Sequence, residues 1–445
     1  MVQLKTDLDA LYPAHLAYVK KLYDTASRAA GKDGVLIASG ALKYTFLDDH
    51  TYPFKVNPHF KAWLPVTDVN DSFILFRGDE KPQLLFHQPE DYWHKTPEDP
   101  AGYWVNEWQV QPISNLQDAH NRLGDVRSLS FIGEETDMAK QWGFDCVNDQ
   151  TMLDQLHFDR AYKTPYELAC LQLANLNAVK GHQMAERAFR NGGSEFDIQH
   201  AYLAAIAHRE QQAPYSGIVA LNEHCAVLHY QHYEHKHHPE PERHAMLIDA
   251  GAECHGYAAD ITRTYAYADG LFADLIESMN EAQLAIIGEI EIGLNYADLD
   301  ARMHMRLADI LKQYNLIDMS VEVMIETNIT STFLPHGLGH FLGLQTHDVA
   351  GFQQSRQGDT KPAPGNHPHL RLTRPIENNQ VFTIEPGLYF IPLLLERLKQ
   401  TRYSSAVNWP LIESLIPSGG IRIEDNIAMV NNSPINLTRE AFNEL

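Results

Sequence analysis

The sequence is poor in cysteine and in basic side chains, and each shortage excludes a class of protein. It holds 4 cysteines in 445 residues, far apart and without a Cys-x-x-Cys pair. Such usage is typical of a reducing compartment and argues against both a disulfide framework and a thiolate metal site. Only 35 basic side chains stand against 58 acidic ones, for a formal net charge of -23. Phosphate backbones and anionic membranes repel such a surface, so we expect neither nucleic acid nor a membrane as a partner.

Long apolar segments are missing as well. No stretch approaches the roughly 20 apolar residues of a membrane-spanning helix, and the charged N-terminal segment lacks the apolar core of a secretory signal. We therefore expect a cytoplasmic protein. Apolar residues make up 44% of the chain, enough for sizeable cores, and 445 residues exceed what one core usually serves. The sequence thus predicts two domains, divided near residue 160 into 1–160 and 161–445.

The first part alternates helical and strand-like segments, a pattern that predicts a small α/β domain. Residues 13–34 have helical spacing, and strands are expected over 34–40, 72–78 and 82–88. The aromatic, proline-broken segment 46–65 between two of these strands is too long for a structural turn. Long ordered loops of this kind often serve the function of a protein.

The second part opens with a strong helix signal. Thr164 can cap the helix, Pro165 fits its first position and Glu167 completes a capping box, and apolar spacing continues to Gly192. We expect further helices over 194–211 and 271–316, with strands dominating the rest. The overall class is therefore α/β (α+β).

Acidic residues stand in four apolar strands of the second part. They are Asp249, Asp260, Glu385 and Glu424. A carboxylate in such a strand costs several kcal/mol unless it is paired or binds a metal. Taken singly, each is explained more simply by an exposed strand end or a nearby lysine. Four such residues together cannot be explained in this way, because Arg263 and Arg422 are the only basic residues close to them in sequence. Four carboxylates neutralise two divalent ions, and oxygen-rich ligation suits hard or borderline ions.

Residues 335–348, PHGLGHFLGLQTHD, contain three histidines and three glycines. His336 and His340 have the spacing of the zinc-protease helix, but glycines separate them and the glutamate of that motif is missing. The loop is therefore not expected to form that helix. The residues alone leave open which of its histidines binds a metal.

The acids and the loop occur in the order Asp, Asp, His, Glu, Glu, in the contexts LIDAGA, AADITRT, PHGLGHFLG, IEPGLY and IRIEDN. Residues 160–430 thereby resemble the metallopeptidases with the pita-bread fold, which include methionine aminopeptidases, aminopeptidase P and prolidases. Segment 46–65 resembles the bacterial prolidases, Xaa-Pro dipeptidases also called organophosphorus acid anhydrolases. The resemblance implies a small creatinase-like N-terminal α/β domain and a pita-bread domain, whose curved antiparallel sheet is covered by helices.

The resemblance also implies the chemistry. The metal ligands would be Asp249, Asp260, His340, Glu385 and Glu424, holding two Mn²⁺ per subunit, with Co²⁺ or Zn²⁺ as alternatives. Asp260 and Glu424 would bridge the ions, which polarise the scissile carbonyl and activate a shared water. Glu385 would also relay a proton to the leaving nitrogen. The implied reaction is hydrolysis of Xaa-Pro dipeptides, with organophosphate triester hydrolysis as a side activity.

Further residues match the substrate site of the family. The implied substrate-binding set is His229, Arg422, Asp49, Tyr215 and Tyr296, with Arg422 holding the C-terminal carboxylate. His336 and His347 would be catalytic, hydrogen-bonding the substrate and the tetrahedral intermediate. Each has a simpler alternative: a core histidine satisfied by backbone, an ion pair between Arg422 and a ligand acid, packing for the tyrosines, and a turn or helix cap for the Asp48–Asp49 pair. In prolidases the position of Asp49 reaches the partner subunit's site, which implies a homodimer. The loop glycines would let the backbone pass close to the metals.

Two other functions remain possible at this point. An aminopeptidase P would act on longer Xaa-Pro peptides, although the prolidase-like segment 46–65 argues against it. A pita-bread protein retained only for binding would have lost metal ligands, whereas this chain keeps all five. The leading hypothesis is a two-metal Xaa-Pro dipeptidase.

Overall fold

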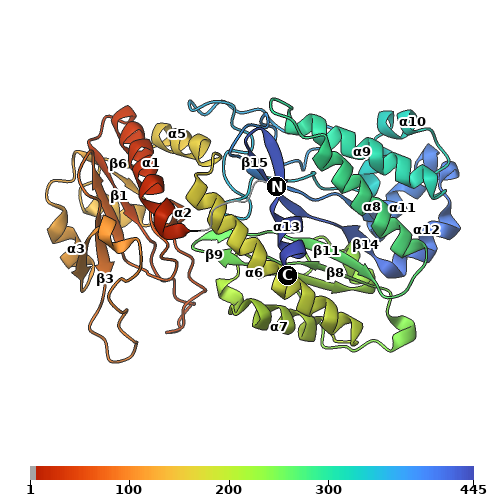
Figure 1. Cartoon of the computed structure of the whole chain (residues 1–445), viewed down its shortest axis with the longest axis horizontal. Helices are drawn as coiled ribbons and strands as arrows, with labels where there is room; N and C mark the ends of the chain where they lie inside the picture. Colours follow the sequence, from red (N-terminus) through yellow and green to blue (C-terminus); the bar gives the residue numbers. More distant parts are fainter. Residues whose placement is uncertain (1–6) are drawn as a thin grey trace.

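The computed structural model describes residues 7–445 and shows two lobes joined by one long helix (Figure 1). The N-terminal lobe contains a six-stranded mixed sheet in the order β4-β3-β2-β1-β5-β6. Its strands are β1 (Gly34–Ala38), β2 (Phe73–Arg77), β3 (Gln83–His87), β4 (Gln109–Ile113), β5 (Leu129–Ile132) and β6 (Cys146–Val147). Its helices are α1 (Leu8–Ala29), α2 (Pro58–Lys61), α3 (Leu116–Leu123), α4 (Thr136–Gln141) and α5 (Gln150–Arg160).

Strand β1 shows why this sheet has helices on both faces. All five of its residues are buried, and alternate side chains enter different cores. Val35 and Ile37 pack with residues of α1 and α5, whereas Leu36 and Ala38 pack with residues of α3 and α4. Strands buried on both faces need such continuous apolar runs. The three strands predicted here and the helix over 13–34 are present, although α1 begins earlier than predicted and ends at Ala29.

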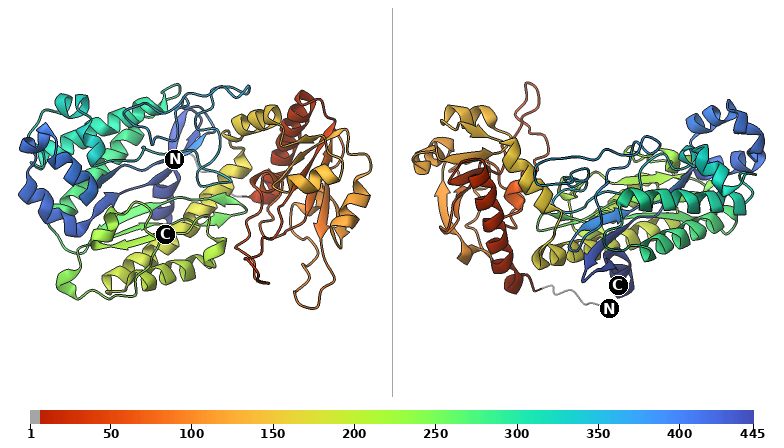
Figure 2. Two further views of the ribbon diagram at one scale, coloured as in Figure 1. Left: turned by 180° about the vertical axis from the view of Figure 1, so that it is seen from behind. Right: turned by 90° about the horizontal axis from the view of Figure 1, so that it is seen from above.

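Helix α6 (Pro165–Arg190) connects the lobes (Figures 1 and 2). The predicted capping box is formed: the Thr164 hydroxyl accepts from the Glu167 N–H, and the Glu167 carboxylate accepts from the Thr164 N–H. Both donors are ones that a helix start leaves unsatisfied. Pro165 occupies the first helical position, as predicted.

The C-terminal lobe is built from small antiparallel sheets with helices on both sides. One sheet has the order β11-β8-β7 and another the order β12-β15-β16, beside the β13–β14 and β9–β10 pairs. The strands are β7 (Ile218–Leu221), β8 (Ala245–Asp249), β9 (Glu253–Cys254), β10 (Tyr257–Ala258), β11 (Thr262–Ala266), β12 (Val381–Ile384), β13 (Gly387–Tyr389), β14 (Gly420–Arg422), β15 (Asp425–Val430) and β16 (Ser433–Asn436). An isolated bridge between Thr262 and Glu424 joins the sheets into one curved surface.

Alternate side chains of β8 pack against different helices, one set on each face of the sheet. Leu247 packs in the core that holds residues of α8 (Leu271–Gly288) and α9 (Tyr296–Gln313). Met246 and Ile248 pack in the core that holds residues of α6 and α7 (Glu195–Ile206). The arrangement agrees with the implied pita-bread architecture of antiparallel strands covered by helices.

The expectation that strands dominate the remainder is wrong for several segments. Short helices lie at α10 (Val321–Glu326), α11 (Pro392–Lys399), α12 (Trp409–Leu415) and α13 (Leu437–Glu444). All four have at most eight residues, too few for a clear apolar period. As expected, residues 335–348 form no helix. Among the described residues no helix is both long and apolar enough to cross a membrane.

Side chains of the C-terminal helix α13 contact residues of strand β15 and hold the strand in place. Arg439 and Arg263 both pair with the buried Asp425, at 2.7 Å each. The Thr438 hydroxyl donates to Asn175 of α6 at 2.8 Å and accepts from the Asn426 N–H at 2.9 Å. Asp425 is thus structural, and its neighbour Glu424 is held at the start of β15.

Candidate metal centre

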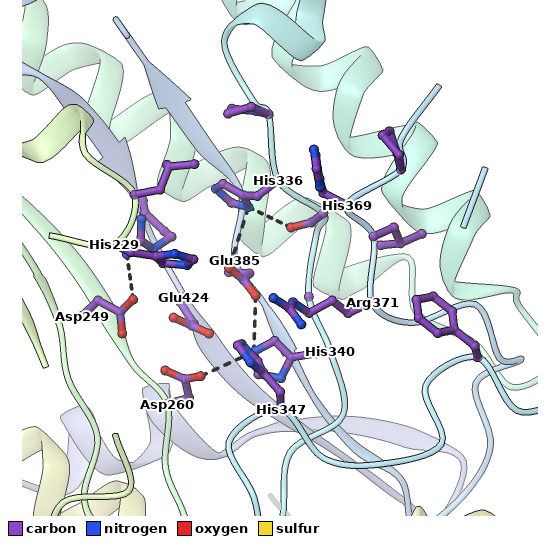
Figure 3. A pocket seen from close by; sticks show the side chains of 18 residues that line it. His229, Asp249, Asp260, His336, His340, His347, His369, Arg371, Glu385 and Glu424 are labelled. Carbon is purple, nitrogen blue, oxygen red and sulfur yellow. Dashed lines mark hydrogen bonds and ion pairs between the residues drawn. The ribbon is translucent and has the colours of Figure 1, made fainter. Parts of the chain in front are cut away.

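A cavity of about 510 Å³ opens where the sheets of the C-terminal lobe meet (Figure 3). It brings together all four strand acids and the three histidines of loop 335–348, although they lie up to 175 positions apart in the chain. Its lining residues include Leu228, His229, Asp249, Asp260, His336, His340, His347, Phe352, His369, Leu370, Arg371, Glu385, Arg422 and Glu424.

The two aspartates share one hydrogen-bond donor. Asp249 ends β8, and Asp260 lies just before β11, the antiparallel neighbour of β8. The Tyr215 hydroxyl lies 2.8 Å from Asp249 Oδ1 and 2.5 Å from Asp260 Oδ1, so both carboxylates face its single proton. Burial raises the pKa of Asp249. The pKa of Asp260 is lowered, because its bonds to His340 and Tyr215 outweigh its burial.

His340 presents one nitrogen to the acids. Its Nδ1–H donates to the Phe341 carbonyl at 2.9 Å, which leaves Nε2 for ligation. That Nε2 lies 3.4 Å from Asp260 Oδ2 and 3.5 Å from Glu385 Oε1. Atoms of Asp260, His340 and Glu424 all lie within 4.8 Å of one another. A backbone bond that fixes the ring while its other nitrogen faces carboxylates is a common arrangement at metal sites.

The two glutamates are held in a strongly anionic environment. The Thr262 hydroxyl donates to Glu424 Oε2 at 2.7 Å. Burial raises the pKa of Glu424 well above its ordinary value, and the neighbouring acids raise it further. Burial also raises the pKa of Glu385 to about 7. The pKa of each glutamate is raised because the carboxylate is buried and lies close to other carboxylates.

The donor set fits divalent metal ions. Four carboxylates converge around one imidazole, while Arg422 pairs with a single carboxylate, Asp249, at 2.7 Å. A single guanidinium leaves most of this charge unbalanced. Two divalent cations would neutralise it, and oxygen donors with one imidazole match the ligand preferences of Mn²⁺ or Co²⁺.

Arg422 is tied into the site on three sides. Its guanidinium donates to Asp249 Oδ2, to the Tyr389 hydroxyl at 2.8 Å and to the Thr262 hydroxyl at 3.2 Å. The ion pair with a ligand acid, which is its simpler alternative role, is therefore present. The Tyr389 hydroxyl in turn donates to His336 Nε2 at 2.8 Å. Tyr389 lies on β13 among apolar residues, and no sequence signal distinguishes it from core.

The remaining predicted histidines lie at the cavity. His336 Nδ1 faces the Gly337 carbonyl at 2.9 Å, and its pKa is lowered to about 3, chiefly by burial. His347 stands edge-on to His340, with ring centroids 4.4 Å apart. Burial and the charge of His340 lower the pKa of His347 to about 4, so its ring is neutral at pH 7. His229 is exposed at the rim.

Three of the predicted substrate residues do not line the cavity. Tyr215 contacts it only through Asp249 and Asp260. Tyr296 is fully buried behind the loop, where its hydroxyl donates to the Thr383 carbonyl at 2.6 Å. This contact agrees with the alternative packing role. The Asp49 side chain is 95% exposed on the N-terminal lobe, and the neighbouring Asp48 accepts from backbone N–H groups in a turn.

Two side chains at the cavity were not predicted. Arg371 and His369 lie on the loop before β12, and Figure 3 shows Arg371 beside Glu385 and His340. The segment that carries them has no regular secondary structure, so no period in the sequence marks them. The loop glycines also differ from expectation: a side chain at Gly339 would overlap Thr383, and one at Gly337 would overlap Leu370. They permit close packing against these neighbours.

Comparisons with known proteins agree with this geometry. Residues 10–158 match the family model of the Xaa-Pro dipeptidase N-terminal domain, and residues 169–431 match that of metallopeptidase family M24. An Xaa-Pro dipeptidase of Pseudoalteromonas translucida is 47% identical over 435 residues, covering 97% of this chain and 98% of that protein. One of Escherichia coli strain SE11 is 46% identical over 438 residues, with the same coverage.

Solved structures share the fold at lower identity. Aminopeptidase P from E. coli with the inhibitor Pro-Leu aligns with a TM-score of 0.70 and 20% identity over 95% of each chain. A zinc-substituted form of that enzyme in complex with product gives the same values. At this identity the likeness establishes the two-domain architecture alone.

Proposed function

We propose a reaction for this chain from one premise: it belongs to metallopeptidase family M24 and carries the N-terminal domain of Xaa-Pro dipeptidases. The chain is a metallopeptidase that hydrolyses Xaa-Pro dipeptides. One observation carries this conclusion, namely that four carboxylates and His340 converge at one cavity in a chain about 47% identical to Xaa-Pro dipeptidases over nearly its whole length.

The metal centre is proposed to comprise Asp249, Asp260, His340, Glu385 and Glu424. The family implies two ions, and we propose Mn²⁺ as the native metal, with Co²⁺ or Zn²⁺ as substitutes, because the donors are mostly oxygen. When bound, such ions polarise the scissile carbonyl and lower the pKa of a water molecule. The shared proton of Tyr215 orients Asp249 and Asp260, and the Phe341 carbonyl fixes the ring of His340.

Glu385 is proposed to move the proton. Its carboxylate takes a proton from the attacking water and delivers it to the proline nitrogen as the peptide bond breaks. A carboxylate beside the reacting water is a usual group for both halves of such a transfer. His336 lies 3.8 Å from Glu385, and we propose that His336 and His347 line the carbonyl side of the substrate.

Binding of the two charged ends would define a dipeptidase. We propose that Arg371 and His229, both at the cavity rim, hold the C-terminal carboxylate of proline. Arg422, already bonded to Asp249, Tyr389 and Thr262, keeps two further N–H groups for the substrate.

The substrate amino group is proposed to meet Asp49 of a second subunit. Asp49 lies in a loop whose apolar side chains are strongly exposed, with Phe46 at 89% and Leu47 at 91%. Such exposure is costly in a monomer, and burial against a second copy removes that cost. We propose a cytoplasmic homodimer, with the N-terminal domain ending near residue 160.

An assay on matched peptides tests the activity. With saturating Mn²⁺, rapid cleavage of Xaa-Pro dipeptides and little cleavage of Xaa-Pro-Xaa tripeptides is expected. Faster cleavage of the tripeptides would instead identify an aminopeptidase P. Full activity after exhaustive chelation would refute the metal mechanism. Organophosphate hydrolysis is proposed as a side activity, because a site that stabilises a tetrahedral intermediate also accommodates tetrahedral phosphorus.

A further inference from the structure

A second cluster of metal-binding side chains lies behind the histidine loop, apart from the five proposed ligands. It consists of Asp300, His304 and His367, whose candidate ligand atoms all lie within 4.8 Å of one another. Asp300 and His304 are almost completely buried, and the His367 side chain is 9% exposed. Nothing in the dipeptidase reaction uses these three residues. We propose that they form a separate site for a single divalent ion, best suited to Zn²⁺.

The spacing of the cluster is that of a helix-borne metal site. Asp300 and His304 are four residues apart on α9, so their side chains leave one face of the helix. His367 approaches from the loop before β12, with Nδ1 2.5 Å from Asp300 Oδ2. Two imidazoles and one carboxylate are a common set of protein ligands for zinc, with the fourth position left to water.

Atoms that would not bind the ion already have partners. Asp300 Oδ1 accepts from the Leu338 N–H at 3.0 Å, and His304 Nδ1 faces the Thr330 hydroxyl at 2.9 Å. His304 Nε2 is therefore left for ligation. Burial lowers the pKa of His304 to about 4, so its ring is neutral at pH 7 and keeps a lone pair. Such outer contacts orient ligands at protein metal sites.

The site also has an entrance and room for a water ligand. A cavity of about 330 Å³ is lined by His304 and His367 and by polar side chains such as Asn328 and Ser331. The two rings stack, with centroids 3.9 Å apart, so one must turn for both to face a single ion. His367 lies on a loop and His304 on a helix, so we place this adjustment at His367.

Counting bound ions tests the proposal. After equilibrium dialysis against Zn²⁺ alone, the wild-type chain is expected to hold about three ions per subunit: two at the principal centre and one here. His367→Asn, on the exposed loop, and His304→Gln should each hold about two. His237→Asn is the matched control, since His237 is exposed in the histidine-rich segment 229–244 and should leave the count at about three.

A second measurement separates loss of the site from misfolding and from failure of the dipeptidase proposal. With Mn²⁺ at the principal centre, added Zn²⁺ should raise the unfolding temperature of the wild type more than that of His367→Asn. About two ions in the wild type, or about three in both cluster variants, would overturn the inference. Neither count depends on which peptides are cleaved.

Discussion

Asp348 accepts a hydrogen bond of 2.5 Å from Arg160 Nη2, inside the protein and between the two lobes. Lys163 Nζ lies 3.3 Å from its other oxygen, and all three side chains are nearly inaccessible. Burial raises the pKa of Asp348, but Arg160 and Lys163 outweigh this and hold it below its ordinary value. Because Asp348 directly follows His347, this ion pair anchors the histidine loop to the segment that joins α5 to α6.

Replacing Asp348 should therefore affect both stability and turnover. Asp348→Asn leaves two buried cations without an anion, and we expect a loss of about 3–5 kcal/mol in the free energy of unfolding. The kcat should fall as well, because His347 loses its anchor. Denaturant unfolding and steady-state kinetics measure the two effects. Asp359→Asn, at an exposed site eleven residues further along the chain, is the control. Equal stability of the two variants would contradict the anchoring role.

Separate substitutions of His336 and His340 should distinguish an effect on metal binding from an effect on turnover. His340→Asn removes a proposed ligand and should lower the number of bound Mn²⁺ ions. His336→Asn should leave the ions bound while kcat falls about 10²–10³-fold, the usual cost of losing one hydrogen-bonding group at a reaction centre. Elemental analysis of dialysed protein with parallel kinetics distinguishes them. Loss of metal in His336→Asn would show that the histidines are assigned wrongly.

Arg371 should act on the proline carboxylate. Arg371→Met is expected to raise KM for Xaa-Pro dipeptides by about 10–100-fold, the worth of one hydrogen bond to a charged group. Stability should change little, since the side chain is exposed. For the corresponding dipeptide amides, which lack the carboxylate, wild type and variant should have similar KM values. An equal loss on acids and amides would place Arg371 elsewhere in the mechanism.

Acid should destabilise the N-terminal lobe through a buried histidine pair between α2 and α5. His59 Nε2 and His157 Nε2 lie 3.2 Å apart, and burial lowers the pKa of His157 from 6.5 to about 4. Above pH 6.5 both the folded and unfolded states are neutral and stability is full. As pH falls from 6.5 to 4, only the unfolded chain takes up the proton, so stability drops by about 1.4 kcal/mol per pH unit for each such histidine.

Thermal unfolding between pH 4 and 7 measures this slope. His157→Gln, which can still bond His59, should show a shallower decline than the wild type. His50→Gln is the control, because the His50 side chain is 83% exposed. A slope unchanged by His157→Gln would mean that other groups set the acid sensitivity.

The residues that could be predicted from the sequence are those that are unusual for their local segment. Asp249, Asp260 and Glu424 stand out because carboxylates are costly in apolar strands, and all of them line the cavity. The Thr164 capping box was predictable because its bonds join residues three apart. Arg371 and Tyr389 were missed, since an arginine in a loop and a tyrosine in a strand break no rule.

The cluster behind the loop shows the same limit. Asp300 and His304 look like ordinary members of an amphipathic helix, and His367 follows more than 60 positions later. Only the fold brings them together. The same holds for Tyr296, whose position in the sequence does not reveal that it is fully buried and that its hydroxyl donates to the Thr383 carbonyl.

The order in which the chain is made has a consequence for how the centre is filled. The proposed ligands span residues 249–424, and Glu424 is held by β15, which is secured in turn by contacts of Thr438 and Arg439 in α13. A growing chain on the ribosome thus displays four ligands long before the enclosure exists. The complete five-ligand centre therefore depends on the last helix of the chain being packed against β15.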